Sequence, residues 1–403
     1  MTRLATMDLF AGCGGLSLGL AQAGLDIRWA NEHDKHAAAT YRQTHPSARL
    51  FEEGVDTFFA RLRDGGDNLP LPGDVDLVAG GPPCQGFSGY NPFKHPADPR
   101  NSLVERFLDI VAYLRPRYVL MENVTGLLAM EGGAVVQALV AGLEKLGFGT
   151  RMGIVQCGNF GVPQSRWRVF IWAATAGLAV PKFSVPTHMF PRKTVFGATR
   201  FRDRMVSPPS AGPDLFWNPM PTVTVGDAIS DLPAIENGGG LDDAEYESKP
   251  LSEFQREARR GSRRLFDHRC STLRDLMYAR CQAVPKKPGA GWLDLPEELK
   301  PLNLIRHGDD RYPNRFGRLH WGGTFNTILT RAFPYWGAVF HPEQDRVLSV
   351  RESARAQGFP DVVNFLGPLS RRYVQVGNAV PPPVARMLAE ELLIATSEVV
   401  VGT

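Results

Sequence analysis

The sequence predicts an α/β fold in which a mostly parallel, doubly wound sheet is followed by a smaller, irregular domain. Up to about residue 180, short apolar runs rich in β-branched residues alternate with segments of helical periodicity. That alternation is typical of consecutive βαβ units. From about Pro181 the chain changes to irregular, proline-rich stretches such as SPPSAGPD and NPMPT. The change indicates that a second domain begins there.

The expected elements follow one another along the chain. Strands are predicted over residues 5–10, 27–31, 75–79, 118–121, 152–156 and 169–173, and helices over 16–23, 34–45, 102–113 and 134–146. Right-handed crossovers would wind these strands into one sheet with helices on both faces, and the strand order stays open. After VGNAVPPP a further helix is predicted over 384–394, with proline ahead of its start. We expect this last helix to pack on the first domain.

The composition limits the classes of function. The chain has 403 residues and can bury a full core, and its 45 basic and 42 acidic residues give a net charge of only +3. Any site for a polyanion must therefore be local. The five cysteines are far apart and form no CxxC pair, which argues against a disulfide framework and a structural zinc site. No signal-peptide core is evident, and the apolar run Val169–Pro181 is too short to span a bilayer. We therefore expect a soluble protein in a reducing, intracellular compartment.

Functional side chains are expected where strands end, because ligands of doubly wound sheets bind at the carboxyl ends of the strands. The first strand leads into FAGCGG, whose glycines allow the backbone to approach a ligand. The second ends at Asn31-Glu32, twenty residues past Gly12, which is the spacing of the acid that binds ribose hydroxyls. The turn lacks a complete GxGxxG pattern, so a nucleoside without phosphates suits it better than a dinucleotide.

Two reactive groups follow the next two strands. Cys84 lies in the stiffened loop GGPPCQGFSGYN, and Glu122 follows the strand ending at Met121. A thiol near positive charge can act as a nucleophile, and a buried carboxyl group can donate a proton. Taken alone, Cys84 could also be a small buried hydrophobe, and Glu122 could be a capping or salt-bridged acid.

Five motifs resemble, in this order, those of the cytosine-C5 DNA methyltransferases: DLFAGCGGLSLGL, GGPPCQGFS, ENV, QSRWR and VGNAVPPPVA. The resemblance implies a Rossmann-like fold that binds S-adenosylmethionine and releases S-adenosylhomocysteine. It implies a catalytic domain over residues 1–185, completed by 371–403, and a target-recognition domain over 186–370. The activity implied is that of a DNA (cytosine-5-)-methyltransferase acting on double-stranded DNA.

The family chemistry assigns roles to the catalytic motifs. Cys84 would add to C6 of a cytosine flipped out of the duplex, and Glu122 would donate a hydrogen bond to N3. Arg168 would hold O2 of the base and orient Glu122, while Arg166 would support the loop or a phosphate. The loop expected to close over the base carries Gln85, Phe87, Ser88 and Tyr90.

The cofactor residues follow from the same resemblance. Those implied to line the methionine and adenosine are Phe10, Gly12, Gly14 and Leu16, with Pro82 also assigned to the cofactor site. Glu32 would bind the ribose, and Asn378 to Val380 would meet the amino-acid end. His33 stands where the family often has an aromatic ring against adenine. The acid expected at the adenine amino group aligns ambiguously between Gly54 and Asp56. No metal ligands are expected.

Two segments of the second domain are candidates for DNA contact. The segment from Arg256 to Arg274, the arginine window, is rich in arginine. It could contact DNA, or it could be an ordinary solvent-exposed helix face. We expect Arg259 and Arg260 to bind phosphates. The loop from Arg331 to Phe340 contains Tyr335 and Trp336. We expect this loop, together with Tyr90, to determine which DNA sequence is preferred.

Stretches such as GRLHWGGTFNTILTRAFP also resemble the catalytic domains of eukaryotic maintenance methyltransferases and plant chromomethylases. The chain lacks a chromodomain between Gly19 and Gly80, and no accessory reader domain is recognised in it. Two alternatives remain, a tRNA cytosine-C5 methyltransferase and a non-catalytic DNA-binding scaffold. We expect a monomer located with the DNA, in the cytoplasm or nucleoid of a bacterium or the nucleus of a eukaryote. A partner restriction endonuclease, and the target sequence, stay open.

Overall fold

The computed structural model describes residues 3–83, 102–191, 199–208, 217–306 and 313–398. Its contacts divide the chain into two compact units. Unit 1 comprises Met1–Phe160, Trp167–Pro221 and Val380–Thr403, and unit 2 comprises Gly161–Arg166 and Thr222–Ala379. Residues 186–221 thus belong to unit 1 and residues 371–379 to unit 2, which differs from the expected boundaries.

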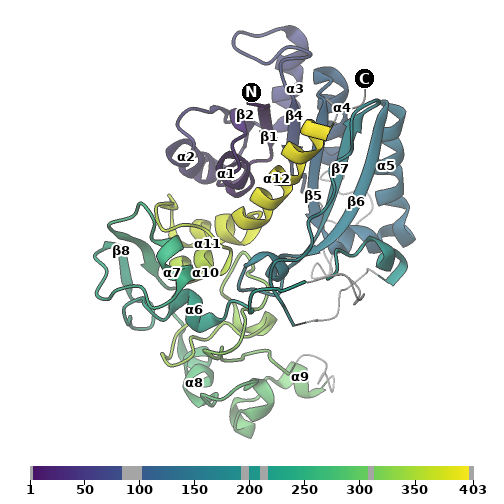
Figure 1. The fold of residues 1–403 in the computed structure, drawn as a ribbon. Coiled ribbons are helices and arrows are strands. Elements are labelled where there is room, and N and C mark those ends of the chain that lie inside the picture. Colours follow the sequence, from purple (N-terminus) through teal and green to yellow (C-terminus); the bar gives the residue numbers. More distant parts are fainter. Residues whose placement is uncertain (1–2, 84–101, 192–198, 209–216, 307–312, 399–403) are drawn as a thin grey trace. The chain divides into compact units, whose positions relative to one another are not determined.

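Unit 1 is built on one seven-stranded sheet (Figure 1). Its strands are β1 (Ala5–Leu9), β2 (Asp26–Asn31), β3 (Arg49–Phe51), β4 (Leu77–Gly80), β5 (Tyr118–Val124), β6 (Phe148–Gln156) and β7 (Trp167–Thr175). The order is β3-β2-β1-β4-β5-β7-β6. Strands β1 to β5 are parallel, whereas β7 runs antiparallel to both β5 and β6. The predicted mostly parallel α/β sheet is confirmed, and β3 is a strand that the sequence pattern missed.

Helices flank this sheet. They are α1 (Gly15–Gln22), α2 (Lys35–Thr44), α3 (Val55–Asp64), α4 (Ser102–Leu114), α5 (Ala134–Lys145) and α12 (Pro382–Glu398), with short 3-10 segments η3 (Thr125–Gly133), η4 (Cys157–Phe160) and η5 (Thr199–Arg204). Side chains from α3, α4 and α5 share one apolar core with β1, β4, β5 and β7. Helix α12 packs on α1 so closely that a Cβ on Gly19 would lie 2.3 Å from the carbonyl oxygen of Pro382.

One described segment, Thr125–Lys145, is long and apolar enough to cross a membrane. It is not a continuous helix, because η3 and α5 meet at Glu131, Gly132 and Gly133, whose φ values of 44°, 65° and 100° are left-handed. Leu127 and Leu139 on its two halves are buried in the core cluster of unit 1. The segment is therefore a core element of the sheet domain.

Unit 2 has little regular structure. Its elements are α6 (Val225–Ile229), β8 (Gly240–Ala244), α7 (Glu253–Ala258), β9 (Leu265–Arg269), α8 (Asp275–Ala283), η6 (Trp292–Asp294), η7 (Glu297–Leu299), α9 (Leu302–Arg306), η8 (Pro334–Trp336), α10 (Val350–Ala356) and α11 (Leu369–Asn378). Strands β8 and β9 form an antiparallel pair. An apolar cluster that includes Trp292, Phe316 and Phe340 forms part of its core.

Buried ion pairs connect the short elements of unit 2. Arg355 of α10 bonds to Asp231 and Asp361, and Arg346 makes a two-pronged contact with Glu352. All five side chains are almost completely buried. Removing one partner of such a pair leaves an uncompensated buried charge, so each contact makes the arrangement of the loops specific.

Candidate active site

Glu122 and Arg168 lie beside each other on paired strands of unit 1. Glu122 is in β5, and in the antiparallel register Arg168 of β7 is opposite Val124. Glu122 and Val124 point to the same face, so Arg168 is a diagonal neighbour of Glu122. Arg168 Nε lies 2.9 Å from Glu122 Oε1, and each side chain is 12% exposed. The pair fixes the orientation of the carboxyl group in a nearly dry position, in agreement with the expected contact.

The strand itself differs from the prediction. β5 was expected to end at Met121, but it continues through Val124 because Glu122 and Asn123 pair with Phe170 and Val169 of β7. Glu122 therefore projects from a strand and not from a loop. A group carried by a sheet is held more rigidly than one carried by a loop.

The segment leading to Cys84 is fastened to the same strand. Asn123 Nδ2 donates to the carbonyl oxygen of Pro82 at 3.1 Å. A Cβ on Gly81 would lie 3.1 Å from Glu122 Oε2, so the glycine allows this close approach. Gly81 and Asn123 belong to the motifs GGPPCQGFS and ENV, but the sequence analysis gave neither of them a role. Cys84 and the loop residues Gln85, Phe87, Ser88 and Tyr90 lie outside the described residues.

The loop after β1 has an unusual backbone. Phe10 and Gly12 each have a φ of 57° and Gly14 one of 88°, which is left-handed backbone in a tight turn. A Cβ added at Gly12 would meet no atom within 4 Å, so the space beside it is open. Glu32, just beyond β2, accepts a hydrogen bond from the Gly12 amide at 2.8 Å and another from the Asp34 amide at 2.7 Å. Glu32 thus connects the ends of β1 and β2.

The remaining predicted cofactor residues have varied surroundings. Leu16 and Pro82 are buried, whereas His33 is exposed and its Nδ1 lies 3.2 Å from Glu32 Oε1. This hydrogen bond raises the pKa of His33 above its ordinary value. Asp56 is an exposed residue in the first turn of α3, paired with Arg106 at 2.7 Å. Asn378 is exposed at the end of α11 in unit 2, and Val380 is buried in unit 1.

The structure does not support a direct catalytic role for Arg166. Its guanidinium is 1% exposed and donates to the carbonyl oxygens of Ile328, Gly377 and Ala379 at 3.0 to 3.1 Å. These contacts lie within unit 2. Of the two roles considered from the sequence, support of a loop agrees with these contacts, and phosphate binding does not.

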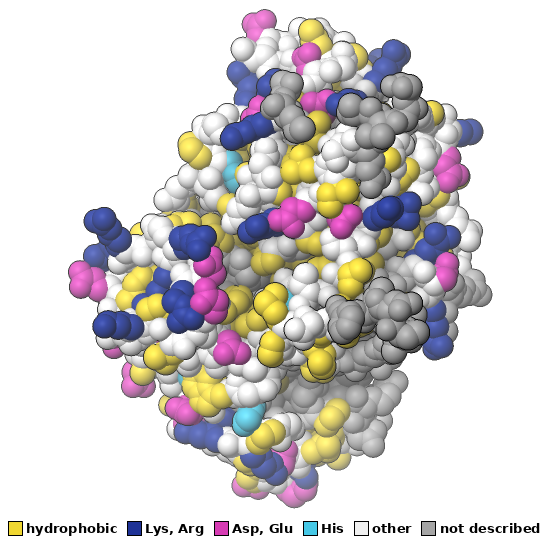
Figure 2. Space-filling view, in the orientation of Figure 1, with side chains coloured by type: hydrophobic (Ala, Val, Ile, Leu, Met, Phe, Trp, Pro, Cys, Tyr) yellow, Lys and Arg dark blue, Asp and Glu magenta, His cyan; other side chains and the backbone are white. Residues whose placement is uncertain are grey.

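The arginine window is less basic than its sequence suggests. Acids from outside and inside the window pair with most of its arginines: Glu253 with Arg256, Asp231 with Arg259, Glu257 with Arg260, Asp243 with Arg264 and Asp242 with Arg269. On the face shown in Figure 2, basic side chains around β8 and α7 accordingly lie among acidic ones.

Arg259 and Arg260 differ sharply. Arg259 is 11% exposed, forms an ion pair with buried Asp231, donates to the Ser248 carbonyl oxygen at 2.7 Å and lies 3.8 Å above the ring of Tyr246. The guanidinium of Arg259 is thus used inside unit 2, which does not favour the expected phosphate contact. Arg260 is 77% exposed and remains accessible.

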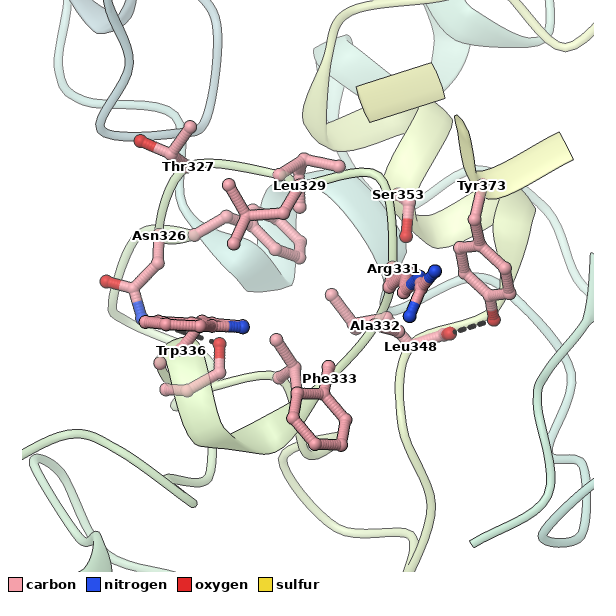
Figure 3. A pocket seen from close by; sticks show the side chains of 15 residues that line it. Asn326, Thr327, Leu329, Arg331, Ala332, Phe333, Trp336, Leu348, Ser353 and Tyr373 are labelled. Atoms are coloured by element: carbon pink, nitrogen blue, oxygen red, sulfur yellow. Dashed lines mark hydrogen bonds between the residues drawn. The ribbon is translucent and has the colours of Figure 1, made fainter. Parts of the chain in front are cut away.

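The loop from Arg331 to Phe340 lines a pocket of unit 2 (Figure 3). Trp336 and Phe333 are 40% and 44% exposed, and Arg331 is also exposed. Tyr335 is half-buried, because its ring packs against Phe316 and Trp336 and its hydroxyl oxygen accepts from Asn303 at 2.9 Å. In Figure 3 the ring of Trp336 lies across the pocket from Leu329. Trp336 is thus accessible to a ligand, whereas Tyr335 supports the loop.

Comparisons with known proteins agree with this arrangement. The family model for the C-5 cytosine-specific DNA methylase matches residues 4–393. The chain is 37% identical over 434 residues to DNA (cytosine-5)-methyltransferase 1A of Oryza sativa subsp. japonica, covering 96% of this chain and 28% of that protein. It is 35% identical over 459 residues to DNA (cytosine-5)-methyltransferase 1 of Mus musculus, covering 97% of this chain and 28% of that protein. The chain therefore spans less than a third of the length of these relatives.

Solved structures share the fold. A protein described as a DNA modification methyltransferase encoded within a prophage of E. coli has a TM-score of 0.67 at 23% identity, over 98% of this chain and 100% of that one. The S. pombe Dnmt2 methyltransferase has a TM-score of 0.53 at 16% identity, over 100% of both chains. At these identities the likeness concerns the fold alone. Because the family model covers nearly all of the sequence and relatives share more than a third of its residues, the chain belongs to the C-5 cytosine-specific DNA methylase family.

Proposed function

We propose that this chain transfers a methyl group from S-adenosylmethionine to C5 of a cytosine flipped out of double-stranded DNA. The observation that carries the proposal is the Glu122–Arg168 pair, which adjoins the Gly81-Pro82 segment leading to Cys84. A cysteine, an oriented carboxyl group and a guanidinium are the groups that this chemistry requires.

Each of the three has a distinct task in the proposed reaction. The thiolate of Cys84 adds to C6, which makes C5 electron-rich enough to take the methyl group. Glu122 donates a hydrogen bond to N3 and so relieves the negative charge that develops on the ring. Arg168 holds Glu122 through Nε and donates through Nη1 to the Trp167 carbonyl oxygen at 2.8 Å, so Nη2 is the nitrogen proposed to donate to O2. Loss of the C5 proton and departure of the thiolate then restore the aromatic base.

The residues of unit 1 fit the proposed cofactor. The open space beside Gly12 would admit a ligand against the backbone. The Glu32 carboxylate, which accepts from the amides of Gly12 and Asp34 and from His33, would accept a ribose hydroxyl at the acceptor position that these contacts leave. S-adenosylmethionine supplies an electrophilic methyl group on a sulfonium centre. Phe10, Gly14 and Leu16 would complete its binding surface.

Contact with DNA is assigned to the exposed groups of unit 2. Arg260 is proposed to bind a phosphate, and Arg331 and Trp336, with Tyr90, to influence which sites are methylated. Residues 1–185 with 371–403 are proposed as the catalytic part and 186–370 as the target-recognition part. The enzyme is proposed to act as a monomer at the DNA of its cell.

The test is a transfer assay with cofactor labelled on the methyl group, using duplex DNA and tRNA as parallel substrates. We expect label in duplex DNA, no transfer by the variant Cys84→Ser, and nearly unchanged binding of S-adenosylhomocysteine by that variant. Duplex DNA containing 5-fluorocytosine should form a covalent adduct, because fluorine at C5 cannot leave as a proton. Transfer to tRNA instead would establish the alternative RNA activity, and turnover by Cys84→Ser would refute the covalent mechanism.

A further inference from the structure

Helix α2 supports the loop after β1 through two buried side chains that no sequence motif singled out. Tyr41 lies near the C-terminal end of α2, and His45 follows as the residue that caps it. Tyr41 is 0% and His45 7% exposed, and their rings lie 4.6 Å apart between centroids. Neither side chain has a surface with which to contact a ligand directly.

His45 is bonded to the loop itself. Its Nε2 lies 3.1 Å from the carbonyl oxygen of Gly14. Burial lowers the pKa of His45, so the ring is neutral and Nε2 carries the proton that it donates. A Cβ on Gly14 would come within 2.5 Å of His45 Nε2 and 3.0 Å of the Tyr41 ring. The glycine that gives the loop its left-handed turn therefore packs directly on both rings.

Tyr41 reaches the other end of the loop through a chain of hydroxyl groups. Its hydroxyl lies 2.9 Å from Ser17 Oγ in α1, and Ser17 Oγ donates to Asp8 Oδ2 in β1 at 2.6 Å. Ser17 is 0% and Asp8 1% exposed. Both sides of the loop are thus held from α2 and its cap. His45 holds Gly14, and Tyr41 holds Ser17 and, through it, Asp8.

We propose that Tyr41 and His45 are positioning residues for the cofactor loop, defined as residues 10–14. By fixing both ends of the loop, they hold its left-handed turns in the form that receives the nucleoside. Without them the loop would have to become ordered when the cofactor binds, and the entropy lost would weaken binding. This inference rests on the proposed function, because the loop's ligand is taken to be S-adenosylmethionine. According to this inference, Tyr41 and His45 affect the affinity for the cofactor and not the chemistry at the base.

The experiment measures binding of S-adenosylhomocysteine by calorimetry, together with KM and kcat for methyl transfer to duplex DNA. In Tyr41→Phe the ring remains and one hydroxyl is lost, so we expect the Kd and the cofactor KM to rise about 5-fold. His45→Ala should raise both about 10-fold or more, because the Gly14 carbonyl loses its donor and the Gly14 turn loses its support. His45→Gln, whose Nε2 can donate to the same carbonyl, should recover most of this loss. In all three variants kcat at saturating cofactor should stay within about 2-fold of wild type.

Two control variants separate positioning from general stability. Tyr118 is equally buried in β5, and its hydroxyl has no hydrogen-bond partner among the described residues, so Tyr118→Phe removes a hydroxyl without affecting the loop. Leu139→Ala in α5 makes a cavity in the core against α4 and the sheet and should lower the Tm while leaving the Kd unchanged.

The outcomes distinguish this inference from the proposed function. If wild type neither binds S-adenosylhomocysteine nor methylates DNA, the proposed function fails first. If wild type does both, and Tyr41→Phe and His45→Ala bind as tightly as Tyr118→Phe, the positioning role is refuted. A fall in kcat with an unchanged cofactor KM would also refute it, as would a Kd that rises equally in Leu139→Ala.

Discussion

Removal of the Arg168 guanidinium is the sharpest test of the candidate site. In Arg168→Ala the Glu122 carboxyl loses the partner at 2.9 Å while remaining in a position where only 12% of its side chain is exposed. The guanidinium would then no longer orient the Glu122 carboxyl group, and O2 of the base would lose its donor. Loss of one preorganised donor in a closed site costs about 100- to 1000-fold in kcat. We expect a fall of this size in kcat.

The assay is single-turnover methyl transfer to duplex DNA at saturating cofactor, with folding checked by circular dichroism. Arg168→Lys keeps the charge but not the planar fork, so we expect it to recover only part of the activity. Arg117→Ala serves as the matched control, because Arg117 is 49% exposed, lies 3.5 Å from Asp76 and precedes β5 at its opposite end. Such an exposed pair contributes at most about 1 kcal/mol to stability, and its loss should leave kcat unchanged.

The pair should also behave as a unit. If Arg168 acts by orienting Glu122, the double variant Glu122→Gln with Arg168→Ala should be hardly slower than the more impaired single variant. Losses that multiply would mean that the two side chains act independently. The reasoning is refuted if Arg168→Ala retains more than about a tenth of the wild-type kcat.

Three further predictions concern other parts of the chain. Arg260→Gln should weaken binding to all duplexes alike and reduce the slope of log affinity against log salt by about one. Arg259→Gln should instead lower the Tm, because the buried Asp231 loses one of its two arginine partners and keeps only Arg355. Binding titrations over a salt series and thermal melts separate the two effects. Trp336→Ala should change which cytosines are methylated in a plasmid pool mapped by bisulfite sequencing, and an unchanged site profile would exclude Trp336 from recognition. Burial raises the pKa of Asp8 to about 7, so folded Asp8 keeps a proton that the unfolded chain releases, and stability should fall as pH rises from about 4 to about 7. Between pH 5 and pH 8 the wild type should lose roughly 2 to 3 kcal/mol more than Asp8→Asn in urea unfolding, and parallel curves would contradict this.

The sequence by itself determined the features that depend on neighbours in the chain. Strand and helix periodicity located most elements of unit 1 to within a few residues. Apolar side chains recur every two residues on the buried face of a strand and every three to four residues on that of a helix. The same local logic placed Glu32 and the glycines after β1 at the ends of consecutive strands. Helix α3 was missed although Val55, Phe58 and Leu62 carry a helical pattern, and β3 was missed because three residues are too few to show a period.

Only the tertiary structure decided which distant groups meet. The count of charges in the arginine window could not show that Asp231 lies beneath Arg259, because that contact depends on how α6 and α7 pack. Arg166 and Arg168 are two residues apart, yet one is bonded to backbone carbonyls and the other to Glu122. Arg168 lies within β7, and the antiparallel register of β7 against β5 brings it to Glu122, whereas Arg166 precedes β7 and belongs to unit 2, where it meets the carbonyl oxygens. A motif names the residue types that a reaction needs, but burial and register decide which of them remain free to perform it.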